Sequence, residues 1–244
     1  MKKIYIALLF LFLGLIIILA GGYIRPKTDL SFKHTPEEIV NKFSGQFSKI
    51  KDARADITFD IGLQIFGCES TRRQKGYGIF KAPDKIKAVL NRNTYLFQGN
   101  SIRRTDPKGK LYYYQLIHAP DLSVGFQPRL IPHNFYLKMV KDDEEDIVIE
   151  GTPKPGVLKN VKKIFFHFDP KEYLLRDLKM SFTDKSIAGE AKITYEKINN
   201  IWMPVATFGK SAIETRAGTL AGFNFNLRGK NFRINTGITD DEFK

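Results

Sequence analysis

The sequence predicts a mainly β fold with a few helices, of the α+β class. Three observations lead to this prediction. Apolar and polar residues alternate along many short segments, as they do in strands with one buried face. Proline, glycine, aspartate and asparagine separate those segments, as they do in hairpin turns. A capped amphipathic helix is indicated near residue 35.

The N-terminus has the features of an export segment. Lys2 and Lys3 precede Ile4–Ile24, a stretch of 21 residues without a charged side chain. Small residues at Ala20–Gly22 suit cleavage by a signal peptidase, whereas the length of the stretch suits an uncleaved anchor across roughly 30 Å of hydrocarbon. The sequence leaves both outcomes open, and in either case we expect the folded part to be exported.

We divide the chain into three parts. Residues 1–22 are the expected signal peptide or membrane anchor, residues 23–34 a short tether, and residues 35–244 a single domain. Of the 244 residues, 43% are hydrophobic, which is enough for one packed core.

The segment Thr35–Glu38 predicts the start of a helix. Thr35 can cap it, Pro36 suits the first helical position, and Glu38 completes a capping box. Apolar residues then recur every three or four positions, at Ile39, Val40, Phe43, Phe47 and Ile50. This spacing places one apolar face against the rest of the domain.

From Arg54 onward the hydrophobic period changes from 3.6 to 2, which predicts strands. Turns are expected at Ala82–Asp84, Gln98–Asn100 and Asp106–Gly109. The predicted strands of this half cover residues 57–65, 77–79, 86–90, 95–97 and 111–117.

The segment Ala119–Val140 interrupts the alternation with prolines at 120, 128 and 132, and we predict broken short helices there. The acidic run Asp142–Asp146 lacks the glycine turn and spaced oxygens of a calcium loop, so we expect a solvated turn. Strands then resume as an antiparallel meander. They are predicted over residues 146–150, 163–168, 174–182, 187–196, 202–208, 220–227 and 232–234.

No residue pattern indicates a catalytic or metal site. His34, His118, His133 and His167 are isolated, without the cysteine pair of a zinc site. The Gly-x-Ser-x-Gly nucleophile motif and the phosphate-binding loop are both absent from the sequence. We therefore expect no enzymatic activity, no metal and no cofactor. Cys68 is the only cysteine, and we expect it to be buried as a small apolar residue.

The formal net charge is +13, from 39 Lys and Arg against 26 Asp and Glu. This charge favours an anionic partner. Because the chain is expected to be exported, and its basic residues are interleaved with acidic ones, we expect a membrane surface and not nucleic acid.

Apolar residues are abundant, with 20 Phe and 10 Tyr. Two interpretations compete. The helix and Ala119–Val140 either fill the sheet's apolar face as a dry core, or cover it loosely and leave a cavity for acyl chains. Composition alone favours the filled core.

The order and spacing of several segments resemble the LolA-type periplasmic lipoprotein carriers and their LolB and LppX relatives. After the capped helix and first strand come Gly78–Lys87 and Tyr95–Asn100. Ile164–Pro170 and Ile234–Gly237 continue the resemblance, which covers most of the exported domain.

This resemblance implies an unclosed, strongly curved antiparallel half-barrel lidded by helices, with lipid acyl chains held inside. It implies a non-catalytic, monomeric periplasmic carrier that moves lipid or lipoprotein acyl chains between membranes and meets membrane surfaces or membrane transport components. The alternative is a module of the same shape, tethered to the inner membrane by residues 4–24, that senses or docks partners without transport.

We expect apolar side chains of the sheet and of the middle segment to line the cavity. Lys81, Lys85 and Arg92 are candidates for contact with headgroups or membrane phosphates. The predicted lining residues are Ile57, Phe59, Ile61, Leu63, Ile79, Ile86, Leu90, Phe97, Leu130, Phe135, Leu137, Leu178, Met180 and Phe223.

Overall fold

The computed structural model describes residues 32–66, 68–98, 101–115, 128–158, 160–184, 187–215 and 218–243. The predicted signal or anchor and nearly all of the tether lie outside these ranges, as do His118 and residues 119–127. Within the described ranges, no helix combines the length and apolar character needed to cross a membrane.

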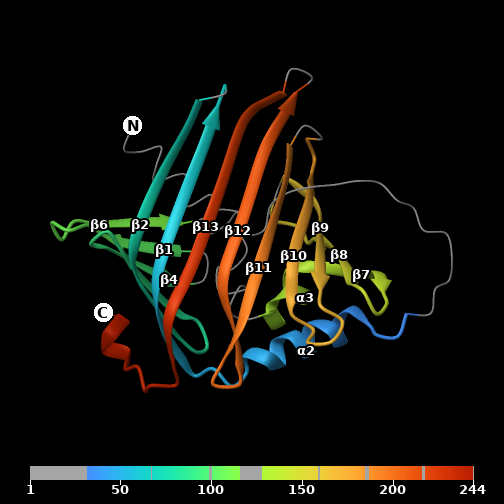
Figure 1. The fold of residues 1–244 in the computed structure, drawn as a ribbon, viewed down its shortest axis with the longest axis horizontal. Coiled ribbons are helices and arrows are strands. Elements are labelled where there is room, and N and C mark those ends of the chain that lie inside the picture. The colour runs from blue at the N-terminus through green and yellow to red at the C-terminus, as the bar shows by residue number, and fades with distance from the viewer. Residues whose placement is uncertain are drawn as a thin grey trace.

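The strands of the described residues form one 13-stranded antiparallel sheet, in the order β6-β5-β4-β3-β2-β1-β13-β12-β11-β10-β9-β8-β7 (Figure 1). The strands are β1 (Asp52–Ile65), β2 (Cys68–Lys81), β3 (Lys85–Leu90), β4 (Asn93–Gln98), β5 (Ser101–Thr105), β6 (Leu111–Gln115), β7 (Phe135–Asp142), β8 (Ile147–Pro153), β9 (Val161–Phe168), β10 (Leu175–Phe182), β11 (Ile187–Ile198), β12 (Ile201–Thr215) and β13 (Gly218–Ile234).

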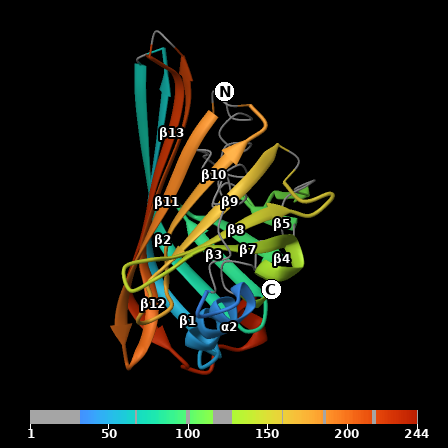
Figure 2. The same cartoon turned by 90° about the vertical axis from the view of Figure 1, so that its right-hand side faces the viewer.

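The sheet is open and curled, which confirms the predicted half-barrel. Its edge strands β6 and β7 are consecutive in the chain, and the connection between them includes the short helices η3 (Pro128–Leu130) and α3 (Ile131–Asn134). The first and last strands, β1 and β13, pair in the middle of the sheet. In Figure 2 the long strands β2 and β13 stand at the left, the shorter strands β4, β5, β7 and β8 lie at the right, and α2 lies between them at the bottom.

Helix α2 (Pro36–Phe47) begins as the sequence predicts. The Glu38 N–H donates to Thr35 Oγ1 over 3.2 Å, and the Thr35 N–H donates to the Glu38 carboxylate over 2.7 Å. Ile39, Val40 and Phe43 are buried on one face of the helix. The predicted apolar face extended to Ile50, which instead follows the helix and packs with Ala53 and Met203.

We call the face of the sheet that α2 covers the inner face. Directly paired residues of neighbouring antiparallel strands point to the same face, so the strand registers assign the residues to faces. On the helix-covered wing (β7–β11), α2 packs in one cluster with side chains such as Ile149, Phe166 and Met180. On the β1–β6 wing, a second cluster joins Phe59, Leu90, Tyr95, Phe97, Ile102 and Phe225.

Two of the tight turns explain why hairpins form where they do. Asn91 with Arg92, and Asn199 with Asn200, all have positive φ and join strands that pair directly on either side. Two successive residues in this conformation make the hairpin turn whose twist matches that of the strands, and asparagine tolerates the conformation well.

Several predictions were wrong. Residues 135–140 form β7 instead of a helix, because Phe135, Leu137 and Met139 alternate along a strand and pair with β8. Strand β5 and the polar first half of β2 were not predicted as strands, since charged side chains there hide the alternation. Strand β13 is continuous where two strands were expected.

Cys68 was expected to be buried, but it is exposed at the start of β2. It pairs with Ile65 across the hairpin that joins β1 and β2, and the hairpin tip projects into solvent. Its position at a tip outweighs the preference of a free cysteine for the interior.

The C-terminal segment covers part of the outer face. The buried Asp52 carboxylate accepts the N–H groups of Thr236 and Gly237 over 2.8 and 3.1 Å. The short helix η4 (Asp240–Phe243) then lies against β3. Since Asp52 begins β1, this contact fixes the tail to the middle of the sheet.

Candidate functional site

The candidate site is the inner face of the β1–β6 wing together with β13. The register pairs Phe59 with Leu227, Ile61 with Phe225 and Leu63 with Phe223, so these side chains form an apolar surface on one face. Phe59 and Phe225 are buried, whereas Ile61, Leu63 and Phe223 are half-buried. The surface therefore continues beyond the packed cluster into partly exposed apolar side chains.

A glycine on the neighbouring strand shapes this surface. A Cβ on Gly209 of β12 would overlap the Phe225 ring, so the ring lies directly over the backbone of β12. Glycine at this position lets a large side chain lie flat on the sheet.

The structure brings most of the predicted lining residues of this wing together, in or around the second cluster. Leu63 extends the same row along β1. The residues in the cluster are Ile57, Phe59, Ile61, Ile86, Leu90, Phe97 and Phe223.

Five other predicted lining residues lie in the first cluster, beside α2. Phe135, Leu178 and Met180 are at most 4% exposed there. Leu130 and Leu137 pack against the same cluster. Protein side chains thus fill the inner face of the helix-covered wing, as in the dry-core interpretation, and the partly exposed apolar surface lies on the other wing.

Ile79 does not belong to the inner face. It pairs with Arg54 and with Lys87, two residues of the outer face. It is 2% exposed there, on the part of the sheet that the C-terminal segment covers. Strand β2 alternates like the others, so Gly76 and Gly78 take the inner positions beside Ile57.

The predicted headgroup residues also lie away from the inner face. Lys81 and Lys85 form ion pairs with Asp240 over 2.6 and 2.9 Å on the outer face. Hydrogen bonds from these two ammonium groups lower the pKa of the Asp240 carboxyl to about 2. Arg92 is exposed in the turn between β3 and β4.

Two cations that sequence reasoning missed do face inward. Arg72 pairs with Ile61, and Arg104 pairs with Tyr95, so both guanidinium groups lie on the inner face. Because β5 and the first half of β2 are polar, neither stretch was predicted as a strand, and the inward position of the two arginines could not be seen. The signal was the two-residue spacing between Ile102 and Arg104, which puts both side chains on one face once β5 is recognised as a strand.

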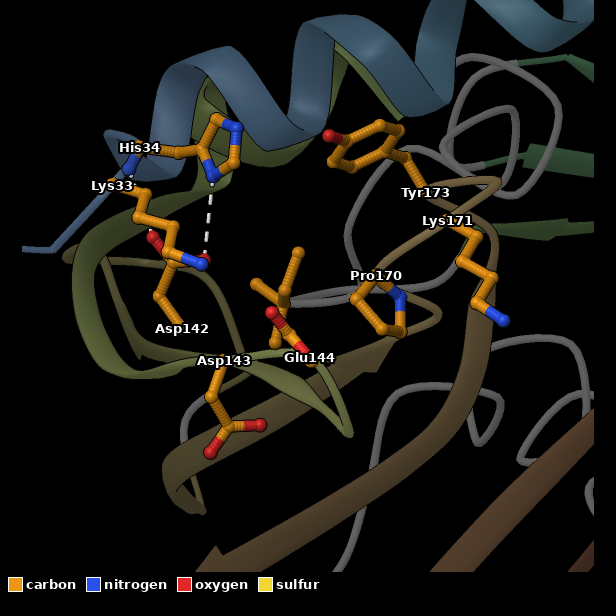
Figure 3. A pocket seen from close by; sticks show the side chains of 9 residues that line it. Lys33, His34, Asp142, Asp143, Glu144, Pro170, Lys171 and Tyr173 are labelled. Atoms are coloured by element: carbon orange, nitrogen blue, oxygen red, sulfur yellow. Dashed lines mark hydrogen bonds and ion pairs between the residues drawn. The ribbon is translucent and has the colours of Figure 1, made fainter.

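Apart from the apolar surface, a pocket lies beside the start of α2 (Figure 3). This pocket of about 280 Å³ is lined by both charge signs, including Lys33, Asp143 and Lys171. The His34 N–H donates to the Asp142 carboxylate over 2.8 Å and closes one side. Because its lining carries both charge signs, the pocket shows no preference for an anionic or a cationic ligand.

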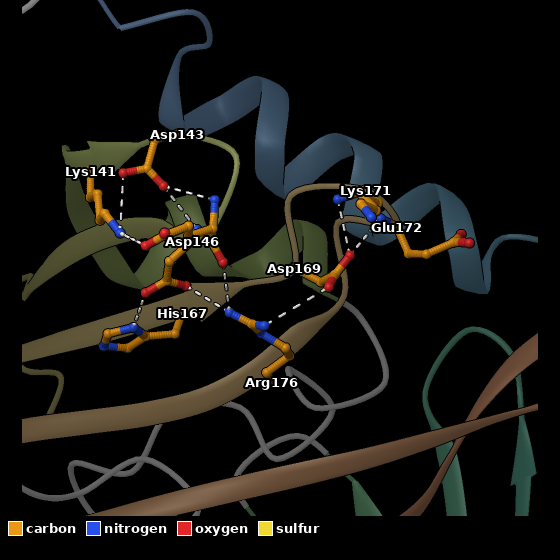
Figure 4. Close-up of polar contacts among 9 residues, drawn as sticks. Lys141, Asp143, Asp146, His167, Asp169, Lys171, Glu172 and Arg176 are labelled. Carbon is orange, nitrogen blue, oxygen red and sulfur yellow. Dashed lines mark hydrogen bonds and ion pairs between the residues drawn. The ribbon is translucent and has the colours of Figure 1, made fainter.

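Residues 143–145 of the acidic run form the expected exposed turn, whereas Asp142 is the last residue of β7 and its side chain is buried. Asp143 accepts the N–H groups of Glu145 and Asp146, and the Asp146 carboxylate is within 3.0 Å of both His167 and Arg176 (Figure 4). The carboxylates of Asp142, Asp143 and Asp146 thus bind groups of the protein itself. Across the described ranges, no group of three His, Cys, Asp or Glu side chains is placed to hold a metal ion.

The open, curled antiparallel sheet with a helix on its inner face defines the class of this protein as a LolA-like fold, as the sequence resemblance predicted. Several solved structures share the fold, including three that are similar to this chain over most of its length. A DUF1329 family protein from Desulfovibrio piger and a putative outer membrane lipoprotein-sorting protein domain from Vibrio parahaemolyticus each match with a TM-score of 0.61 and 13% identity. Both matches cover 85% of this chain and 95% of the other.

The third structure is a LolA superfamily protein from Nitrosomonas europaea, with a TM-score of 0.58 and 10% identity over 86% of this chain and 98% of the other. No family model matches the sequence, and no curated protein matches it. At these identities the likeness concerns the fold.

Proposed function

We propose that this protein is a non-catalytic carrier of the bacterial envelope, which binds lipid or lipoprotein acyl chains on its inner face and moves them between membranes. The observation that carries the proposal is the partly exposed apolar surface on the β1–β6 wing, where Ile61, Leu63 and Phe223 continue outward from a packed cluster. A folded protein rarely leaves a contiguous apolar surface without a use.

The energetics support a carrier of this kind. Each methylene of an acyl chain left in water costs about 0.8 kcal/mol, so a chain of sixteen carbons faces a barrier on the order of 12 kcal/mol when it crosses water unshielded. An aliphatic and aromatic surface such as that around Phe59 and Phe97 removes most of this cost. It does so without specific polar bonds that would hinder release.

The proposal includes a location and partners. The protein acts in the periplasm, free or anchored by residues 4–24, as a monomer, and exchanges its cargo at membrane surfaces or with membrane transport components. No catalytic step, cofactor or nucleic acid is part of it.

The direct test is the lipid content of the purified protein. We expect organic extraction and mass spectrometry of the full chain, expressed in a bacterium and purified without detergent exchange, to yield acyl lipid in a ratio of about one per protein or more. Protein that carries only trace lipid after this procedure would contradict the proposal.

The first prediction places a charge on the apolar surface. Leu63→Glu should abolish lipid retention, because burying a carboxylate against acyl chains without a partner is strongly unfavourable. Gln64→Glu is the matched control, since Gln64 is the next residue of β1, exposed and on the outer face. Equal retention by both variants would place the lipid elsewhere.

A docking or sensing module without transport is the second candidate, and one observation favours it. The hairpin tips of β1–β2 and β12–β13 lie side by side, with the Phe66 N–H donating to the Leu220 carbonyl over 3.0 Å. Phe66 is 77% exposed and Ile65 54% exposed at these tips. In the same purification, a lipid-free protein that retains an envelope protein partner would favour docking over carriage.

A further inference from the structure

The inner face of the β1–β6 wing carries cationic side chains. The registers of β1 to β6 assign two cationic side chains, Arg72 and Arg104, to the inner face of these strands, and no carboxylate. The acidic residues of β1 point outward, where Asp60 pairs with Arg73 and Arg228. Within these strands, the charged side chains beside the apolar surface are therefore cationic, and the nearest carboxylate, Asp106, lies in the turn after β5.

Arg104 is held in place by neutral groups. Its Nε and Nη2 atoms donate to Asn93 Oδ1 over 3.1 and 2.8 Å, and its guanidinium lies 5.0 Å from the centre of the Tyr112 ring. Among the described residues, no carboxylate lies within ion-pair distance of it. Two bonds to one amide oxygen and an aromatic face orient the guanidinium, and its Nη1 donors make no hydrogen bond to a residue that the structure describes.

The nearest turn does not neutralise this charge through an ion pair. The Asp106 carboxylate accepts the N–H groups of Lys108 and Lys110 over 2.9 Å each, and Tyr112 donates its hydroxyl to it over 3.3 Å. The carboxylate thus stabilises its own turn and positions the ring on which Arg104 lies.

Arg104 borders the apolar cluster directly. Its partner across the strands is Tyr95, which is 5% exposed and packs in the cluster with Leu90 and Phe97. Burial raises the pKa of the Tyr95 hydroxyl, while the positive charges of Arg104 and Arg72 act in the opposite direction. Both guanidinium groups are thus within electrostatic reach of one buried hydroxyl at the edge of the apolar surface.

We propose that Arg104, assisted by Arg72, binds the anionic headgroup of an acyl lipid whose chains lie on the adjoining apolar surface around Phe59 and Phe97. The shared chemistry is an acyl chain that ends in a phosphate or a carboxylate. A guanidinium binds either anion through paired hydrogen bonds, and the bonds are strong where water is partly excluded. The inference rests on the proposed function and narrows its cargo from any acyl group to an anionic lipid.

Titration calorimetry with three single-chain ligands of equal chain length tests this. Myristoyl lysophosphatidylglycerol carries a phosphate, myristate carries a carboxylate, and monomyristin is uncharged. With the delipidated full chain below the micellar concentration, Arg104→Gln should weaken binding of the anionic ligands by about tenfold or more and leave monomyristin within about twofold.

Arg103→Gln is the matched control, since Arg103 is the preceding residue of β5 and faces outward. It should leave all three affinities unchanged. Arg104→Lys keeps the charge but lacks the paired donors, so it should retain only part of the anion affinity. Equal losses for all three ligands in both Arg104 variants would show a role in folding only and would overturn the inference.

The outcomes separate this inference from the proposed function. A loss for lysophosphatidylglycerol alone identifies the cargo anion as a phosphate, and a loss for myristate alone identifies it as a carboxylate. If the wild-type protein binds all three ligands equally and Arg104→Gln changes none of them, the inference fails while acyl binding stands. If the wild-type protein binds none, the proposed function fails as well.

Discussion

At the scale of single residues, lysines that sequence patterns assign to a membrane contact serve another purpose. Lys81 and Lys85 both reach Asp240, and Lys87 donates to the Glu242 carbonyl. Together with the Asp52 contacts to Thr236 and Gly237, these bonds fasten the C-terminal segment to the outer face. These three lysines therefore bind the protein's own C-terminal segment, and we do not expect them to contact a membrane.

The Asp240 cluster leads to a pH prediction. Its carboxyl pKa is lowered from 3.8 to about 2 in the folded protein, because hydrogen bonds from Lys81 and Lys85 favour the charged form. A depressed folded-state pKa stabilises the fold above the unfolded-state pKa, and this stabilisation is lost as the pH falls through about 4 to 2. Carboxyl NMR titration should give an apparent pKa of about 2 for Asp240.

The double variant Lys81→Gln, Lys85→Gln should return the Asp240 pKa toward 3.8. Lys138→Gln, on the distant edge strand β7, is the control and should leave it unchanged. An Asp240 pKa near 3.8 in the wild-type protein would contradict the ion pairs at the C-terminus.

At the scale of elements, glycine positions decide how the apolar side chains pack on the strands. Gly209 of β12 leaves room for the Phe225 ring, which is 2% exposed. Gly45 of α2 is different, since a Cβ there would meet no atom within 4 Å. We therefore expect substitution by alanine to change the free energy of unfolding in opposite directions at the two glycines.

We predict that Gly209→Ala lowers the free energy of unfolding by about 1–3 kcal/mol, because the buried Phe225 ring must shift within a packed cluster. Gly45→Ala should raise it by about 0.5–1 kcal/mol, since alanine is the better residue in an exposed helix position. Denaturant unfolding measures both. Stabilisation by Gly209→Ala would mean that Phe225 does not lie over β12.

At the scale of the whole molecule, the sheet depends on the pairing of its first and last strands. The chain runs from β1 outward to the edge strand β6, crosses to the other edge at β7, and returns through β8 to β13. Between the two wings, β13 pairs with β1 and with β12, and β12 pairs with β11. Such a contact between the ends of the chain forms late and slowly in folding.

A chain that ends at Thr215 should therefore not fold cooperatively, because β1 and β12 would lose their shared partner in the middle of the sheet. A chain that ends at Thr239 lacks only η4 and its ion pairs, and should fold with a modestly lower melting temperature. Circular dichroism during heating and hydrogen exchange distinguish the two. A cooperative transition in the shorter chain would show that each wing folds alone.

Features that depend on nearby residues were predicted from the sequence, whereas features that depend on distant residues were not. The Thr35 capping box, the alternation of β1 and the turn at Asp106–Gly109 were predicted correctly, since each depends on residues a few positions apart. Strand β7 was mistaken for helix because prolines at 128 and 132 precede it, and because the sequence does not show that this segment pairs with β8.

The candidate site was predicted in part for the same reason. Alternation identified the apolar row from Ile57 to Leu63, and the structure assembles it with Phe97 and Phe223 from other strands. It could not identify Arg104 as a neighbour of Tyr95, nor Asp240 as the partner of Lys81, because both contacts join strands or segments through register.

The amino-acid sequence by itself thus determined the class of fold, the helix start and the alternating faces, because these follow from local backbone preferences and side-chain spacing. Tertiary structure alone decided that α2 fills one wing of the inner face while the other keeps half-buried apolar side chains beside Arg72 and Arg104. The physical reason is that curvature and strand register bring together residues from distant parts of the chain, and no local pattern records which of them meet.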